Sequence, residues 1–444
     1  MDRNSAKPDV STVPGDAAKR WVEFHHQFAA PSTYVYGYVW DHSEPAAGPF
    51  CTDIDGNVLM DFTAHVGSMP LGYNNPKILD PLAEFDLVDP LKIAGQDFYV
   101  TGGGLDPDIP GPTGLMDRLT DISSHYGMDT VFLSNTGAEA VENAIKVAYD
   151  HTRGKYAITA EGAFHGRTLG TLSLNRSEEV YRRHFPEIPS VETTPFCTDR
   201  GCTPATCECG FFFEDTSWLR EMLAEGTGWV NNEEVAYLIL EPIQGEGGYR
   251  FPSEAFAAEV GALCREHDLT LVVDEVQSGV GRTGEMWASD HYGFTPDVIA
   301  SAKALRVGAT IARRGVFPEG TSRISSTWGA GDILAAAQGS LTIDAIQEYG
   351  LLENATRRGR SMKEHLRDAD LPGVVDVRGK GLMLAVEFDS ENRREDAIAA
   401  ALSRGLLTVG CGQKTMRLLP PLDVTEREIE LGANLLVESV ESVA

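Results

Sequence analysis

The chain has 444 residues, enough to bury a large core and to form two or three domains. Its 66 acidic and 37 basic residues leave a net charge of −29, which argues against nucleic acid and membrane surfaces as partners. Ten of the basic residues are lysines, and the acidic residues are spread along the chain. This pattern indicates adaptation to high salt, with an ordinary acidic enzyme as the alternative.

The sequence predicts a cytoplasmic protein. Residues 1–16 are polar and lack the apolar core of a secretion signal, and no apolar run approaches the ~20 residues that span a bilayer. The seven cysteines are an odd number, and in this compartment they are better interpreted as thiols or ligands than as a disulfide framework.

The amino-terminal region predicts a small cap. A polar leader precedes an amphipathic helix around residues 17–28. Residues 34–40 and 50–62 then indicate a small hairpin, with Asp55-Gly56 between the apolar runs of the second stretch.

Between about residues 112 and 305, short apolar runs alternate with helical segments. This alternation predicts a mostly parallel sheet with crossover helices. The predicted strands are 130–134, 156–159, 235–240, 269–273 and 298–300, and the predicted helices are 141–151, 217–225 and 256–267.

The chain after Asp332 predicts a second, α+β domain. Its expected elements are helices over 333–345 and 351–369, strands over 374–377, 383–388 and 415–419, and a final helix from Thr425. We therefore expect residues 86–332 to form a large domain and residues 333–444 a smaller one, to which residues 1–85 contribute.

Four polar residues lie at or near the ends of apolar runs: Asn135, Glu241, Asp274 and Lys303. Ligands of open α/β sheets bind beyond the carboxyl ends of the strands, so these residues are expected to share one crevice.

Asp274 and Lys303 favour a pyridoxal 5′-phosphate (PLP) site. A buried carboxylate needs a cationic partner, and the protonated ring nitrogen of PLP is one. Lys303 is the only lysine between Lys155 and Lys363, which makes it the single candidate in this region for a Schiff base. The alternatives are a helix cap for Asp274 and a surface position for Lys303.

Two further segments suit such a ligand. Residues 134–140 join a strand to a helix through small residues and could cradle a phosphate at the helix amino terminus. In residues 162–167, Phe164 offers an aromatic face and Arg167 a guanidinium that can bind a carboxylate. Each feature could equally be structural. Residues 134–140 could be an ordinary βα turn, Phe164 a core residue and Arg167 part of a surface ion pair.

Together these motifs resemble the class III (subgroup II) aminotransferases of PLP fold type I, from about residue 48 to the carboxyl terminus. The strings that carry the resemblance are FLSNTGAEAVENAIKVA, AFHGRTLGTLSL, LILEPIQGEGG, LVVDEVQSGVGRTG, DVIASAKAL, STWGAG and VRGKGLMLAVEF. The resemblance implies an aspartate-aminotransferase-like α/β fold with a smaller α+β domain.

The same resemblance implies the roles of individual residues. Lys303 would hold PLP as a Schiff base, Asp274 would pair with the ring nitrogen, and Thr327 would reach the phosphate from a neighbouring subunit. The other cofactor-binding residues would be Gly137 and Ala138 at the phosphate, Phe164, His165 and Val276 at the ring, and Gln277 at the ring hydroxyl. Shared sites imply a homodimer or a dimer of dimers.

Three residues bear on the substrates. Glu246 and Arg417 match the family's switchable pair, in which Arg417 binds the α-carboxylate of glutamate or 2-oxoglutarate when Glu246 releases it. An unswitched ion pair is the alternative. Arg167 matches the arginine that holds the carboxylate of the substrate in 4-aminobutyrate and lysine 6-aminotransferases.

The expected reaction is a ping-pong transamination from an ω-amino acid to 2-oxoglutarate, with 4-aminobutyrate first among the donors and lysine or ornithine next. The string STWGAGD and the Gly/Pro-rich loop of residues 102–114 depart from the family pattern and leave the donor open. A racemase or aminomutase on the same scaffold and a catalytically silent assembly protein are the rival functions.

Cys197, Cys202, Cys207 and Cys209 lie within thirteen residues. Four thiols this close could bind zinc, but the spacing lacks a C-x2-C knuckle. The sequence therefore favours a reduced or loosely structural loop over a metal site.

Overall fold

The computed structural model of the chain describes residues 1–85, 95–106, 111–198, 201–293, 295–326 and 330–443. Contacts divide it into two compact units. Residues 1–79 and 350–444 form unit 1, and residues 80–349 form unit 2. The domain boundaries at residues 85 and 332 stay a prediction.

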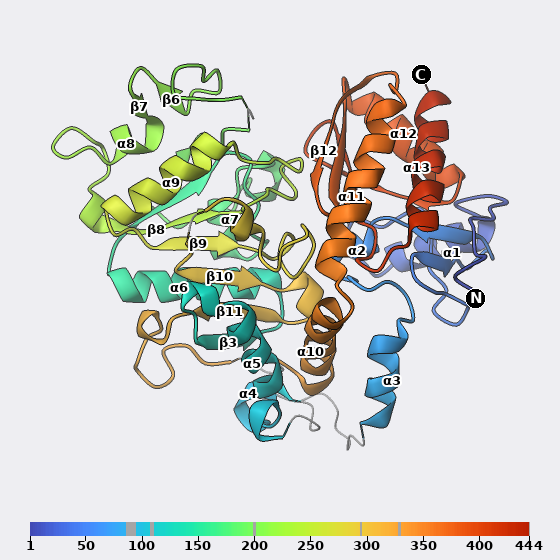
Figure 1. Cartoon of the computed structure of the whole chain (residues 1–444), viewed down its shortest axis with the longest axis horizontal. Coiled ribbons are helices and arrows are strands. Elements are labelled where there is room, and N and C mark those ends of the chain that lie inside the picture. The colour runs from blue at the N-terminus through green and yellow to red at the C-terminus, as the bar shows by residue number, and fades with distance from the viewer. Residues whose placement is uncertain (86–94, 107–110, 199–200, 294, 327–329, 444) are drawn as a thin grey trace. The chain divides into compact units, whose positions relative to one another are not determined.

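Unit 2 is built on a central sheet with the strand order β3-β11-β10-β9-β8-β4-β5 (Figure 1). Only β11 runs antiparallel to its described neighbours, so the α/β class with a mostly parallel sheet is confirmed. The strands are β3 (Thr130–Ser134), β4 (Tyr156–Ala160), β5 (Val191–Thr194), β8 (Val235–Leu240), β9 (Leu271–Asp274), β10 (Val298–Ser301) and β11 (Gly308–Ala312).

The helices of unit 2 begin where the sequence offers capping residues. Thr136, Ser253 and Asp332 accept amide hydrogen bonds at the starts of α6, α9 and α10. The helices are α3 (Pro76–Glu84, which begins in unit 1), α4 (Gly95–Phe98), α5 (Pro112–Ile122), α6 (Gly137–Thr152), α7 (Leu169–Leu174), α8 (Trp218–Met222), α9 (Glu254–Glu266) and α10 (Ile333–Glu348).

The core of this unit lies between α6 and the middle of the sheet. Buried side chains of α6 such as Val141 and Ile145 meet Ile239, Val272 and other buried residues of the strands. Because α6 rests on five strands, its first turn is held at the carboxyl edge of the sheet, beside the polar residues that follow the strands.

An excursion separates β5 from β8. It contains the two-residue strands β6 (Phe212–Phe213) and β7 (Thr216–Ser217), which pair with each other, and then α8. The four clustered cysteines belong to this excursion.

The amino-terminal half of unit 1 contains α1 (Asp16–His26) and the hairpin of β1 (Phe50–Thr52) and β2 (Val58–Asp61). Residues 34–40 form no strand, so that part of the predicted hairpin is wrong. The ring of Tyr36 contacts those of Tyr34, edge-on, and Tyr38, at a tilt, and the segment is paired through the isolated bridge from Trp40 to Asp53.

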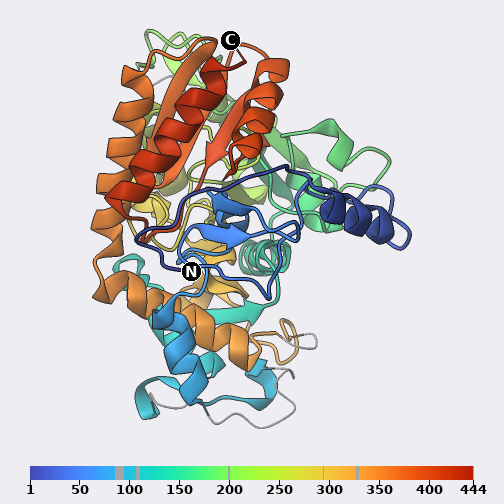
Figure 2. The same ribbon diagram turned by 90° about the vertical axis from the view of Figure 1, so that its right-hand side faces the viewer.

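The carboxyl-terminal half of unit 1 is a four-stranded antiparallel sheet with three helices beside it (Figure 2). The elements are α11 (Leu351–Asp368), β12 (Val374–Lys380), β13 (Met383–Phe388), α12 (Glu391–Ser403), β14 (Leu406–Leu407), β15 (Val409–Cys411), β16 (Thr415–Leu418) and α13 (Glu426–Glu441). β14 pairs with β2, which joins the two halves.

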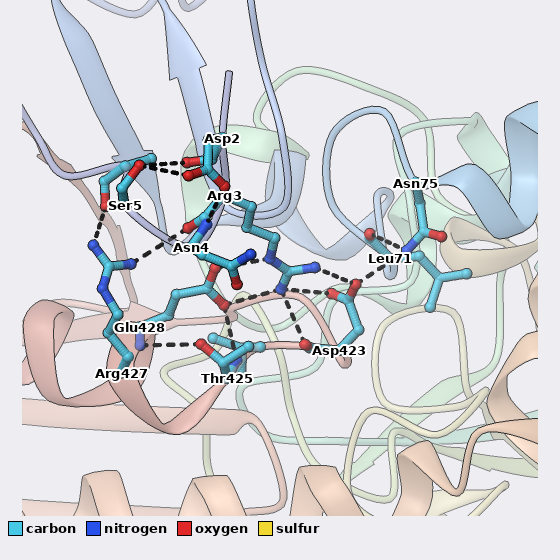
Figure 3. Close-up of polar contacts among 12 residues, drawn as sticks. Asp2, Arg3, Asn4, Ser5, Leu71, Asn75, Asp423, Thr425, Arg427 and Glu428 are labelled. Carbon is cyan, nitrogen blue, oxygen red and sulfur yellow. Dashed lines mark hydrogen bonds and ion pairs between the residues drawn. The ribbon is translucent and has the colours of Figure 1, made fainter.

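Arg3 ties the amino terminus to the start of α13 (Figure 3). Its guanidinium donates to Glu428 Oε1 at 2.8 Å and to Asp423 Oδ2 at 2.7 Å. Glu428 also forms a capping box with Thr425, so one carboxylate serves both the helix cap and the ion pair.

None of the helices in the described ranges is both long and apolar enough to cross a membrane.

Candidate active site

The register of the sheet brings the ends of several strands to one edge. Leu240 lies opposite Val273, and Ala300 lies opposite Asp274. Glu241 and Lys303, which follow β8 and β10, therefore flank Asp274 on the neighbouring strands. Gly308 of β11 lies opposite Ser134, so the turn into α6 starts at the same edge.

Asp274 is buried at the end of β9 and binds His165. The His165 Nδ1 atom lies 2.8 Å from Asp274 Oδ2, and the Val276 amide donates to Asp274 Oδ1 at 3.0 Å. The His165 amide donates to Asn175 Oδ1 at 2.7 Å, which fixes the loop that carries the ring. His165 Nε2 is buried and has no hydrogen-bond partner among the described residues.

Glu241 joins two loops around this pair. Its carboxylate accepts the Phe164 amide at 2.9 Å and the Gly245 amide at 2.7 Å. Burial raises the pKa of Glu241 to about 7, and the nearby Asp274 carboxylate adds to the rise. Glu241 therefore holds two loops in place. One is the loop of residues 162–167, called the aromatic loop because it bears Phe164, and the other bears Glu246.

The first turn of α6 is closely packed against both loops. A Cβ atom on Gly137 would lie 2.7 Å from Val276 Cγ1, so only glycine fits there. Gly166 has a φ of +136°, and a Cβ atom on it would lie 2.8 Å from the Cβ of Ala138. Helix geometry leaves the first-turn N–H groups, those of Gly137 and Ala138 included, without intrahelical acceptors, so they can bind an anion.

Gln277 and Lys303 are the remaining described residues that were predicted to bind the cofactor. A Cβ atom on Gly245 would lie 2.8 Å from Gln277 Oε1, and this buried oxygen has no hydrogen-bond partner within the described residues. Lys303 opens a single 3-10 turn, Lys303–Leu305, and its side chain is half-buried.

A second group of side chains lies beside Phe164. The Arg167 guanidinium lies 4.3 Å from the ring centroid of Tyr181, and the Tyr181 hydroxyl donates to Glu246 Oε1 at 3.1 Å. The Tyr181 ring also meets the Phe164 ring edge-on, at 5.5 Å between centroids. Arg167 itself is exposed and forms no salt bridge within the described part of the chain.

Two predicted residues do not belong to the described part of unit 2. Arg417 is buried on β16 of unit 1, whereas Glu246 belongs to unit 2, so their pairing stays a prediction. Thr327 lies outside the described residues.

Sequence reasoning missed the contributions of Tyr181 and Asn175, and it expected His165 at the ring without anticipating its bond to Asp274. Tyr181 lies in a 3-10 turn, Glu179–Tyr181, that matches no motif and reaches the site only through the fold. The His165–Asp274 hydrogen bond joins residues 109 positions apart. A histidine beside an aromatic residue in a loop at the strand edge was the available signal.

The arrangement fits PLP. Backbone amides at a helix start suit a phosphate, and the close contact of Gly137 with Val276 leaves no room there for a larger side chain. The buried Asp274 suits a protonated ring nitrogen, and the buried Gln277 oxygen and His165 Nε2 atom are polar groups that a ligand could satisfy.

The chain is similar to known aminotransferases. The profile of the family described as Aminotransferase class-III matches residues 41–440. The acetylornithine aminotransferase of Synechocystis sp. is 32% identical over 87% of this chain and 86% of its own length. The 4-aminobutyrate aminotransferase of Mycobacterium leprae is 30% identical over 88% of this chain and 89% of its own.

A solved structure shows the same likeness. The lysine aminotransferase of M. tuberculosis, in its internal aldimine form, superposes with a TM-score of 0.82 at 26% identity, covering 96% of this chain and 100% of that chain.

Proposed function

Because the chain belongs to the class III aminotransferases, which are PLP-dependent transaminases, we propose that it moves the amino group of an ω-amino acid to 2-oxoglutarate by a ping-pong mechanism. The first candidate donor is 4-aminobutyrate, followed by lysine and ornithine. The observation that carries this choice is Arg167, an exposed cation held against the ring of Tyr181 and not paired with a carboxylate within the described residues.

In this proposal the residues of unit 2 hold PLP. The amides of Gly137 and Ala138 bind its phosphate, and Phe164 and Val276 enclose its ring. Gln277 reaches the ring hydroxyl, and Lys303 Nζ bonds covalently to the cofactor. When bound, PLP supplies an electron sink for the bond that is broken at the substrate carbon.

Asp274 would keep a proton on the ring nitrogen of bound PLP, because a buried carboxylate favours a cationic partner. His165 holds Asp274 Oδ2, and the Val276 amide holds Oδ1, so the carboxylate cannot rotate away. Lys303 Nζ would take the proton from the amine-bearing carbon of the donor and deliver it to the cofactor carbon that Lys303 had held.

Arg167 binds the carboxylate at the far end of the donor. The Arg167 guanidinium lies 4.3 Å from the Tyr181 ring centroid, and a guanidinium of this kind can bind a carboxylate through two parallel N–H groups. Glu246, which accepts from Tyr181, adds a negative group suited to a distal ammonium such as that of lysine. Arg417 would bind the α-carboxylate of 2-oxoglutarate.

The test uses pairs of donors that differ only in the carboxylate. Wild-type enzyme is given 4-aminobutyrate or butylamine without an acceptor, and conversion of the cofactor is followed by absorbance. Arg167→Met should lower kcat/KM for 4-aminobutyrate by about 100-fold and leave butylamine nearly unchanged. Arg182→Met, which removes an arginine paired with Glu187, is the matched control.

The two half-reactions test separate parts of the proposal, namely the role of Arg167 toward the donor and the identity of the acceptor. Recovery of the starting spectrum on addition of 2-oxoglutarate supports that acceptor. Equal losses for both amines in Arg167→Met would reject the role of Arg167, and loss of optical activity of an amino acid without cofactor conversion would reject transamination.

We also propose a homodimer, or a dimer of dimers, in which Thr327 reaches the phosphate bound by the neighbouring subunit. Thr327→Ala should then weaken PLP binding about tenfold, because one phosphate hydrogen bond is lost. Mixed dimers of Thr327→Ala with Lys303→Ala should contain one site in which both residues are intact. If Thr327 instead reached the phosphate of its own chain, both sites of the mixed dimer would be defective.

A further inference from the structure

The excursion between β5 and β8 gathers four thiols that the transamination site does not use. The Sγ atoms of Cys197, Cys202, Cys207 and Cys209 all lie within 4.8 Å of one another. From this convergence we propose that the four cysteines bind one zinc ion, in a structural site separate from the active site.

The separations suit a single tetrahedral ion. A Zn–S distance of about 2.3 Å places the sulfurs of a tetrahedral site about 3.8 Å apart. The Cys207 and Cys209 sulfurs lie 3.2 Å apart, well beyond a disulfide bond length of about 2.05 Å, and all four residues are free thiols. An iron–sulfur cluster would have to place several iron and sulfide atoms among these sulfurs, which are too close together for it.

Neighbouring donors orient two of the sulfurs. The Ser253 hydroxyl accepts the Phe256 amide at 3.1 Å and lies 3.3 Å from Cys197 Sγ, so its own proton can be donated to that sulfur. The Phe212 amide lies 3.3 Å from Cys207 Sγ and points at it as a donor. Hydrogen bonds of this kind stabilise thiolates and fix ligand geometry around a metal.

The loop needs such a link because it has little core of its own. Residues 203–206 and 208–210 are exposed. The loop is anchored where it leaves and rejoins the unit, since the rings of Phe196 and Phe211 lie 5.1 Å and 4.6 Å from the ring of Phe256 on α9. Between these anchors, a tetrahedral ion would replace the missing apolar contacts.

Four thiolate ligands fill the coordination of zinc, so the ion has no open position for a substrate or water. Binding displaces the proton from each protonated thiol and couples metal binding to the ordering of the loop. The site is therefore structural, and we revise the expectation of a metal-free loop that the spacing alone suggested.

The test measures the metal in the purified full-length enzyme, produced in medium that contains both zinc and iron. Elemental analysis should find about one zinc per chain in wild type. The double variant Cys207→Ser/Cys209→Ser should lose most of it, because these two ligands are the least buried of the four. Cys264→Ser, which removes a thiol of α9 outside the group, should retain the zinc.

A second measurement needs no variant. Cobalt(II) exchanged into the wild-type enzyme should give the intense red-region absorption of a tetrahedral thiolate site, away from the absorbance of the cofactor. Four thiols that react fully without chelator, zinc no higher in wild type than in the double variant, or stoichiometric iron in place of zinc would each overturn the proposal.

Discussion

His165 Nδ1 and Asp274 Oδ2 form a buried hydrogen bond of 2.8 Å that links the aromatic loop after β4 to the end of β9. Together with the Val276 amide at Oδ1, this bond holds both carboxylate oxygens of Asp274. In the proposed mechanism, His165 is thus a positioning residue for the carboxylate that would pair with the cofactor ring.

Asp274→Asn should lower kcat by about 100-fold or more, because the amide preserves the shape but cannot hold a proton on the ring nitrogen. His165→Gln should lower it by a smaller factor, about tenfold, and shift the absorbance maximum of the bound cofactor. Single-turnover rates with 4-aminobutyrate measure both effects. Equal rates for wild type and Asp274→Asn would contradict the assignment.

Gly137→Ala should weaken cofactor binding and destabilise the enzyme by about 1–3 kcal/mol, since the new methyl group overlaps Val276 Cγ1. Val276→Ala removes the overlapping atom, so the double variant should recover most of the loss. A double-mutant cycle of thermal unfolding, with and without PLP, measures this coupling. Additive losses would show that the two residues do not meet.

Glu275 should make the enzyme less stable as pH rises through neutrality. Burial raises the pKa of Glu275 from its ordinary value near 4.5 to about 7. The stabilising effect of the neutral Glu275 carboxyl is therefore complete below pH 4.5, where this group is protonated in the folded and the unfolded chain alike. This stabilisation is lost as pH rises to about 7 and beyond. The total change is at most about 3 kcal/mol.

The comparison of wild type with Glu275→Gln isolates this group. The glutamine cannot ionise, so the free energy of unfolding of wild type should fall relative to the variant between pH 5 and pH 8. Ser278 and Ser289 hydrogen-bond Glu275 and keep the replacement in place. A difference that stays constant over this range would show that Glu275 does not titrate there.

Arg3→Ala should destabilise unit 1 by about 1–3 kcal/mol, because Glu428 and Asp423 are left buried without their cation. The estimate is below that for a fully buried pair because a quarter of the Arg3 side chain is exposed. Lys19→Ala, which removes an exposed ion pair with Asp16, serves as control and should change stability by less than about 0.5 kcal/mol.

Added salt should stabilise the enzyme. The net charge of −29 creates self-repulsion that salt screens, with a Debye length of about 3 Å at 1 M. The melting temperature should rise when potassium chloride is increased from dilute to molar concentration. An unchanged melting temperature would favour the ordinary acidic enzyme over adaptation to high salt.

The fold could be predicted where apolar runs are short and bounded. The five strands expected between residues 112 and 305 are all present, and all five end within one residue of the prediction. Residues 34–40 look like a strand because tyrosines alternate along them, but pairing depends on a neighbouring strand that a local pattern cannot reveal.

The site was predictable where a residue follows a strand. Asp274 and Lys303 are placed by the register of two adjacent strands, which the order of apolar runs anticipates. Tyr181 and the four thiols depend on the paths of irregular segments, and their convergence becomes visible only in three dimensions.

The cysteine loop begins and ends against the same aromatic ring, that of Phe256. Its two ends are therefore neighbours in space, and most of the residues from 203 to 210 between them are exposed. It offers a place where a peptide tag, a fluorophore or a surface anchor can be grafted without changing the residues around Lys303.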